Sequence, residues 1–367
     1  MPDTSAAAFS SHRHMEMLSQ LLLSPGSAVS SSPIATELAN MQREEFDQFV
    51  ALASTNHVVV RGMEAFYKTM LRMQDQTRAA WVKEVIEMER ARIFNALRFA
   101  RNIFDAFDEA GFDVTVMKSL DHWPDFGNDV DLYTNSPSDR VIEMMRHRFD
   151  AKLAPRSWGD RLACKWNFVI PGLPEAVEIH MGRLGQTGEQ LVLASRLPSR
   201  ARSLQFGEYT FRVPSASDRL MVSTLQRMYR HFYFRLCDVI DSGELAVSGD
   251  LNYHELRSAA QAADIWEGVA TYLVIVSDYV SGFREAGLDL PEFVITAARF
   301  GGNLVYFGKD FLRIPILPQS AELYRLQLAG LLRKKELHSS ARLGLLPWLA
   351  TAAAVGQKIT GSDKGIW

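Results

Sequence analysis

The spacing of apolar residues changes twice along this chain, and that change limits the folds open to it. From about 34 to 110 apolar residues recur every three or four positions, which is typical of amphipathic helices. Between 111 and 213 short β-branched segments alternate with Gly, Pro and Asn, which predicts strands and turns. After Pro214 the helical spacing returns. We therefore expect an α+β fold in which a small mixed sheet lies between two helical regions.

These changes divide the sequence into four predicted parts. Residues 1–33 are rich in Ser, Ala and Pro, so we expect a mobile tail there. An N-terminal helical region over 34–110, an α/β core over 111–213 and an all-helical C-terminal domain over 214–367 follow. The helices predicted for that last domain cover 215–242, 252–263, 265–285, 289–300, 319–335 and 340–358.

Composition excludes several classes of protein. The 367 residues carry a net charge of −3, which gives no strong nucleic-acid signal. Cys164 and Cys237 are the only cysteines, so a disulfide framework is excluded and a cytoplasmic location is expected. The longest apolar stretch, 343–356, contains Pro347 and is too short to span a membrane. The basic run Arg333-Lys334-Lys335 just before it leaves peripheral membrane contact open.

Three carboxylates form the most informative pattern in the sequence. Asp129 and Asp131 lie two apart on a predicted strand, so their side chains share one face of it. Carboxylates this close repel each other unless a cation lies between them, which suits a hard divalent metal. Glu178 lies on another predicted strand with apolar neighbours. If the two strands pair, the three acids can hold two metal ions of the kind used in phosphoryl or nucleotidyl transfer.

This pattern resembles the nucleotidyltransferase superfamily of the DNA polymerase β type, and in particular an uncharacterised bacterial branch of it. Ser119 is similar to the small residue of that superfamily's turn. Asp129-Val130-Asp131-Leu132 is similar to its acid pair, and Val177-Glu178-Ile179 to its distant acid. The segment Arg230 to Asp238 also looks like a helix of the bacterial branch. The resemblance covers about 95–290.

The resemblance implies a fold, a reaction and a set of ligands. It implies a nucleotidyltransferase core and a Mg²⁺-dependent transfer of a nucleoside monophosphate from an NTP, with ATP expected, to a hydroxyl-bearing acceptor of unknown identity. Two Mg²⁺ ions are implied, held by the three acids that also form the catalytic set. The residues that we expect to bind the nucleotide are Lys118, Ser119, His180 and Arg183.

Two departures from the superfamily pattern keep other functions open. Lys118-Ser119 stands where glycine usually precedes the small residue and lets the backbone approach a triphosphate. The third acid is Glu178 and not Asp. A catalytically degenerate adaptor or regulatory nucleotide-binding protein is therefore the alternative. A third hypothesis is a helical interaction protein in which the three acids lie on the surface only. Carboxylates more than about 8 Å apart would favour it, because metal ions could not bridge them.

Overall fold

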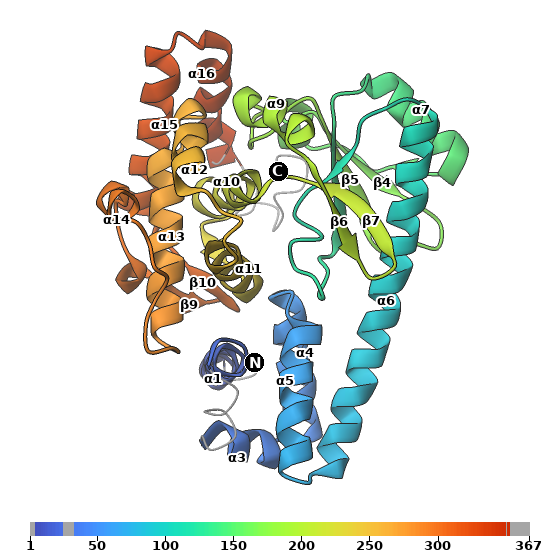
Figure 1. Cartoon of the computed structure of the whole chain (residues 1–367), viewed down its shortest axis with the longest axis vertical. Coiled ribbons are helices and arrows are strands. Elements are labelled where there is room, and N and C mark those ends of the chain that lie inside the picture. Colours follow the sequence, from blue (N-terminus) through green and yellow to red (C-terminus); the bar gives the residue numbers. More distant parts are fainter. Residues whose placement is uncertain (1–3, 25–32, 350, 353–367) are drawn as a thin grey trace.

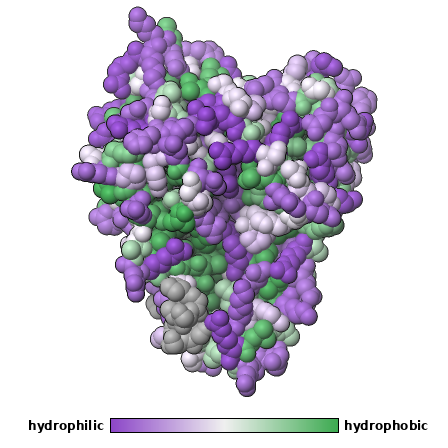
Figure 2. Space-filling view, in the orientation of Figure 1, coloured by the Kyte–Doolittle hydropathy of each residue, from purple (hydrophilic) through white to green (hydrophobic). Residues whose placement is uncertain are grey.

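A computed structural model describes residues 4–24, 33–349 and 351–352 of the chain. Figure 1 shows a sheet on one side of the molecule, a stack of C-terminal helices on the other, and N-terminal helices below both. In the same orientation, this face is mostly hydrophilic, with hydrophobic atoms gathered beside α1 (Figure 2). The α+β class predicted from the sequence is confirmed. Within the described residues, no helix is both long and apolar enough to cross a membrane.

Five helices lie in the described residues of the N-terminal part. They are α1 (Thr4–Leu23), α3 (Pro33–Asn40), α4 (Arg43–Thr55), α5 (Val59–Arg72) and α6 (Gln76–Glu109). The predicted tail is wrong for residues 4–23, because they form α1, which packs on α4 and α5. Met15, Met17 and Leu18 of this helix are buried in the helical core. Residues 25–32 of the predicted tail lie outside the described residues.

Helix α6 is the longest element and belongs to two hydrophobic cores. It begins after Asp75, whose side chain accepts a hydrogen bond from the Arg78 backbone N–H, and ends just before Gly111, which has φ +69°. Its first half packs with α1, α3, α4 and α5 and with the C-terminal helices. Its second half packs against the sheet. The helix therefore connects the two cores.

The main sheet has five short strands in the order β1-β2-β5-β4-β3. The strands β2 and β5 run parallel, and every other pair is antiparallel, so the sheet is mixed as predicted. The crossover from β2 towards β5 begins with helix α7 (Ser138–Phe149) and also contains the short helix α8 (Trp158–Leu162). The strands are β1 (Thr115–Val116), β2 (Asp129–Thr134), β3 (Lys152–Leu153), β4 (Lys165–Val169) and β5 (Ala176–Met181).

Alternation along β2 and β5 separates an apolar face from a polar one. Val130 and Leu132 of β2 belong to the core formed with the second half of α6, as do Val177 and Ile179 of β5. The residues between them therefore project to the other side of the sheet. The helix α9 (Leu191–Ser199) and the hairpin β6 (Arg202–Phe206) to β7 (Tyr209–Val213) complete this part.

The C-terminal part is not all-helical as predicted. A three-stranded sheet of β8 (Tyr233–Phe234), β10 (Phe311–Arg313) and β9 (Tyr306–Gly308) lies within it. The helix predicted over 215–242 is broken at Phe232, where φ is +57° and the chain leaves the helical conformation. The helices are α10 (Ala216–Gln226), α11 (Leu236–Val247), α12 (Tyr253–Ala262), α13 (Trp266–Ser281), α14 (Glu292–Ala297), α15 (Ala321–Arg333) and α16 (Leu337–Gly344).

Candidate functional site

A polar cavity of about 190 Å³ lies between the main sheet and the segment that joins α10 to α11. The sheet and the turn before it contribute acids and a lysine, and the helical side contributes arginines and a histidine. Residues that line it include Lys118, Ser119, Asp129, Asp131, Glu178, Arg227, Arg230, His231 and Arg235. Residues from 118 to 235 thus meet at one place, which brings the predicted acid pattern and the basic segment together.

Asp131 and Glu178 are direct neighbours in this cavity. They are paired in register on the parallel strands β2 and β5. Their carboxylate oxygens and a ring nitrogen of His180 all lie within 4.8 Å of one another, and the three residues are buried. For Asp131 and Glu178, this distance does not favour the hypothesis of superficial acids. Asp129 lines the same cavity but does not belong to that tight group.

Two lysines hold the buried carboxylates together. Lys118 Nζ lies 2.7 Å from Asp131 Oδ1 and 3.9 Å from Glu178 Oε1, so one ammonium group bridges both acids. Lys165 Nζ lies 3.0 Å from Glu178 Oε2 and 2.9 Å from Asp160 Oδ1. His180 Nε2 is 2.8 Å from Glu178 Oε1. The position between Asp131 and Glu178 is therefore one that favours a cation.

The two acids differ in protonation. Burial, opposed by Lys118 and reinforced by Glu178 and Asp129, raises the pKa of Asp131 to about 8. Burial also acts to raise the pKa of Glu178, but the hydrogen bond with His180 and the charge of Lys118 hold it well below its usual range. The pair therefore carries one firmly ionised carboxylate and one that readily takes a proton.

The turn before β2 has the backbone that glycine would favour. Lys118 has φ +45°, in the left-handed region that side chains with a Cβ rarely adopt. Ser119 Oγ donates to the Asp129 carbonyl at 2.9 Å and accepts from the Asp131 backbone N–H at 2.8 Å. The Ser119 backbone N–H points to the Met117 carbonyl. Ser119 therefore fixes the turn to the strand, and its donors are already engaged.

Arg183, the fourth residue expected to bind nucleotide, lies away from the acids. Its Nη1 donates to the Gly188 carbonyl at 3.0 Å, which closes the loop after β5. It does not line the polar cavity, so the structure does not bring it together with Asp131 and Glu178.

The helical wall of the cavity supplies the positive charge. Arg227 is 1% exposed, and its Nε lies 2.7 Å from Asp238 Oδ2, so this pair is structural. Asp238 also accepts from the Arg235 backbone N–H at 2.6 Å. The spacing of three residues indicates an ion pair of Asp238 with the Arg235 side chain. In the structure the Asp238 carboxylate pairs with Arg227 instead. Arg230 and Arg235 are left to face the cavity.

A second, apolar pocket of about 60 Å³ adjoins the polar cavity. Both are lined by Lys118, Gln226 and Arg230, which form the boundary between them. The walls of the apolar pocket come from α10 and from the C-terminal end of the chain, through Leu225 and Leu343 among others. Leu343 is buried there while Trp348 is 76% exposed, so only part of the apolar C-terminal stretch packs inward.

No protein family model matches the chain. No curated protein matches it either. Its function must therefore be argued from the geometry of the cavity.

Proposed function

We propose that this protein is a Mg²⁺-dependent nucleotidyltransferase, which moves a nucleoside monophosphate from an NTP, with ATP the expected donor, to a hydroxyl group of an acceptor. The observation that supports it most is the placement of Asp131 beside Glu178 on parallel strands, in a buried cavity whose other wall carries Arg230 and Arg235. Acids beside arginines suit a triphosphate that arrives with a divalent cation.

The donor set fits Mg²⁺. Asp129, Asp131 and Glu178 offer carboxylate oxygens, the ligands that hard divalent cations prefer, and they line one cavity. The Lys118 ammonium already bridges two of them, which supports a cation at that point. When bound there, Mg²⁺ neutralises phosphate charge and makes a nearby hydroxyl group more acidic.

The remaining work falls to side chains of the chain itself. Arg230 and Arg235 neutralise the phosphate oxygens on the helical side of the cavity. Glu178, kept ionised by His180 and Lys165, offers an acceptor that orients the attacking hydroxyl. The adjoining apolar pocket takes the nonpolar part of one substrate. Positioning and charge neutralisation supply most of the rate increase in such reactions.

The test is pyrophosphate release. The full-length protein is incubated with each NTP, Mg²⁺ and a panel of hydroxyl-bearing acceptors. We expect release by the wild type and at least about a 100-fold lower rate for Asp131→Asn. Asp139→Asn is the matched control, since Asp139 is an exposed acid on α7. Equal rates for the wild type and Asp131→Asn would contradict the proposal.

A nucleotide-binding protein without chemistry is the second candidate, and one observation favours it. Both donors of Ser119 are engaged within the turn, and a lysine occupies the left-handed position that glycine would take. This candidate predicts that NTP with Mg²⁺ raises the melting temperature while no acceptor yields pyrophosphate. Release with any acceptor, lost in Asp131→Asn, would exclude it.

A further inference from the structure

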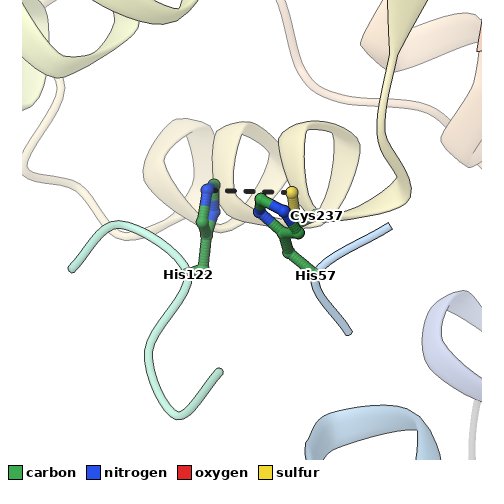
Figure 3. Close-up of side chains that lie close together, drawn as sticks. All are labelled: His57, His122 and Cys237. Carbon is green, nitrogen blue, oxygen red and sulfur yellow. Dashed lines mark hydrogen bonds between the residues drawn. The ribbon is translucent and has the colours of Figure 1, made fainter. Parts of the chain in front are cut away.

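A second cluster of side chains lies beside the same cavity, and the proposed reaction does not use it. His57, His122 and Cys237 come from the loop after α4, the loop before β2 and the first turn of α11 (Figure 3). One ligand atom of each lies within 4.8 Å of the other two. Their exposed fractions are 6%, 8% and 0%, so the cluster is buried.

The imidazole ring of His57 has no hydrogen-bond partner among the described residues. Neither Nδ1 nor Nε2 of its buried ring is satisfied. Its backbone has φ +54°, which is uncommon for a residue with a Cβ. A buried and unsatisfied polar group is costly, and a bound ligand is one reason to keep it.

His122 is fixed by a carboxylate on its other side. Its Nδ1 is 2.5 Å from Asp241 Oδ2, and its Nε2 is 3.9 Å from Cys237 Sγ (Figure 3). Asp241 in turn accepts from Arg61 Nη1 at 2.7 Å. A histidine that donates from one ring nitrogen to a carboxylate and presents the other is the usual arrangement at a metal site, because the carboxylate orients the ring.

We propose that His57, His122 and Cys237 bind one zinc-type transition-metal ion, and that its fourth ligand comes from the polar cavity. Two imidazole nitrogens and one thiolate select such ions over Mg²⁺. His57 and His122 line the cavity, which leaves the fourth position open towards it. Cys237 releases its thiol proton to solvent as the metal–sulfur bond forms.

The observed spacing needs only a small adjustment. The ligand atoms of a tetrahedral zinc site lie roughly 3.5 Å apart, by the bond lengths of such sites. Closing the cluster from separations of up to 4.8 Å therefore takes side-chain movements of about 1 Å.

Neighbouring charges allow a cation here. Arg61 is paired with Asp125 at 2.8 Å and with Asp241 at 2.7 Å, so two carboxylates balance one guanidinium group. Arg227 is paired with Asp238. Arg61 and Arg227 are thus largely neutralised, and the second carboxylate on Arg61 favours the metal, whereas the charge of Arg235, which also acts on His57, opposes it.

The order Asp241, His122, Cys237 also resembles that of a catalytic triad with a cysteine nucleophile. Cys237 is 0% exposed, and it is not among the residues that line the polar cavity. A substrate carbonyl in the cavity has no access to its sulfur. The cluster is therefore built for binding and not for nucleophilic attack.

Co²⁺ titration of the full-length, chelator-treated protein tests this inference. A thiolate-bound Co²⁺ gives a near-ultraviolet charge-transfer absorption that carboxylates cannot give. We expect one Co²⁺ per chain with that absorption, displaced by Zn²⁺ and not by excess Mg²⁺. Cys164→Ser, which changes the other cysteine, and Asp131→Asn, which changes the acid cluster, should bind Co²⁺ with the same affinity and absorption as wild type. The Asp131→Asn result separates this site from that of the proposed reaction.

Cys237→Ser and His57→Gln should each weaken Co²⁺ binding at least tenfold and abolish or alter the charge-transfer absorption. His57→Gln decides the matter if Cys237→Ser fails to fold, because His57 gives up no hydrogen bond on substitution. Far-ultraviolet circular dichroism shows whether each variant is folded. A wild type that binds neither Co²⁺ nor Zn²⁺, or a folded His57→Gln that binds Co²⁺ as tightly as wild type, would overturn the inference.

Discussion

Two clusters of buried side chains lie beside the polar cavity, the acid cluster with Asp131 and Glu178 and the cluster of His57, His122 and Cys237. They differ in how their polar atoms are paired. Asp131 and Glu178 are matched by Lys118 and Lys165, so the chain itself supplies the opposite charge. His57 is matched by nothing within the described residues. Ion pairs therefore hold Asp131 and Glu178 together with or without a ligand, although His180 Nδ1 beside them is also unsatisfied, whereas no hydrogen bond satisfies the ring of His57 among the described residues. The two also differ in donor type, so the cations that we propose for them belong to different classes.

Of the changes considered, removing one acid of the carboxylate cluster is expected to alter the free energy of unfolding most. Glu178→Gln leaves Lys165 and Lys118 with less negative charge in a buried site, which should lower the free energy of unfolding by about 3–5 kcal/mol. Urea unfolding measures the change. Asp139→Asn, an exposed acid, should shift it by less than about 0.5 kcal/mol. Equal stability of Glu178→Gln and wild type would mean that the lysines do not depend on this acid.

The contribution of Asp131 to the stability of the metal-free protein should fall as pH rises. Since the pKa of Asp131 is about 8 in the folded state and 3.8 ordinarily, the folded chain holds a proton at this site that the unfolded chain releases. Between these two values rising pH weakens this contribution, while the lowered pKa values of Glu178, His180 and His231 act in the opposite direction. The melting temperature of the wild type relative to that of Asp131→Asn, measured in chelator, should therefore decline across this window. Parallel curves for both proteins would refute the assignment.

Arg230 tests whether the positive charge on the helical wall of the cavity binds nucleotide. Arg230→Gln removes a cavity charge and should weaken the binding of Mg²⁺–NTP by about tenfold, or about 1.4 kcal/mol, with little change in stability. Isothermal titration calorimetry gives the affinity. Arg325→Gln, on α15 and exposed, is the matched control. If Arg230→Gln bound Mg²⁺–NTP with unchanged affinity, Arg230 on the helical wall would not be part of the proposed nucleotide site.

The smallest effect is expected at the turn. Lys118→Gly relieves a left-handed backbone, worth about 0.4–1 kcal/mol, but also removes the ammonium that bridges the acids. Lys118→Ala removes the ammonium and keeps the strain. We expect Lys118→Gly to be the more stable of the two by about 1 kcal/mol, and both to gain more stability from Mg²⁺ than wild type does. Thermal melts with and without Mg²⁺ measure this.

Local patterns predicted the sheet face of the site well. The alternation in Asp129-Val130-Asp131-Leu132 assigns the acids to one face of β2, and the same rule assigns Glu178. The pairing of β2 with β5 was a conditional expectation, and the structure places Asp131 beside Glu178. The face of each strand depends on residues close together in sequence, which is where periodicity carries information, whereas the pairing of the two strands does not.

Other features depend on contacts that no local pattern contains. The tail prediction failed because the burial of Met15 and Leu18 on distant helices decides that α1 is ordered. The sequence pattern does not predict the helix break at Phe232, because an aromatic residue gives no sign of a left-handed backbone. His57 and Cys237 lie 180 positions apart without a spacing motif, so their meeting follows only from the fold.

The helix α6, which packs in both hydrophobic cores, has a consequence for how the protein comes apart. A helix of 34 residues is about 51 Å long at about 1.5 Å per residue, and here both halves are needed to bury apolar surface. Melting either core would expose one side of the shared helix and withdraw support from the other. The two cores should therefore unfold together in a single cooperative transition, and amide exchange along α6 should report one opening free energy and not two.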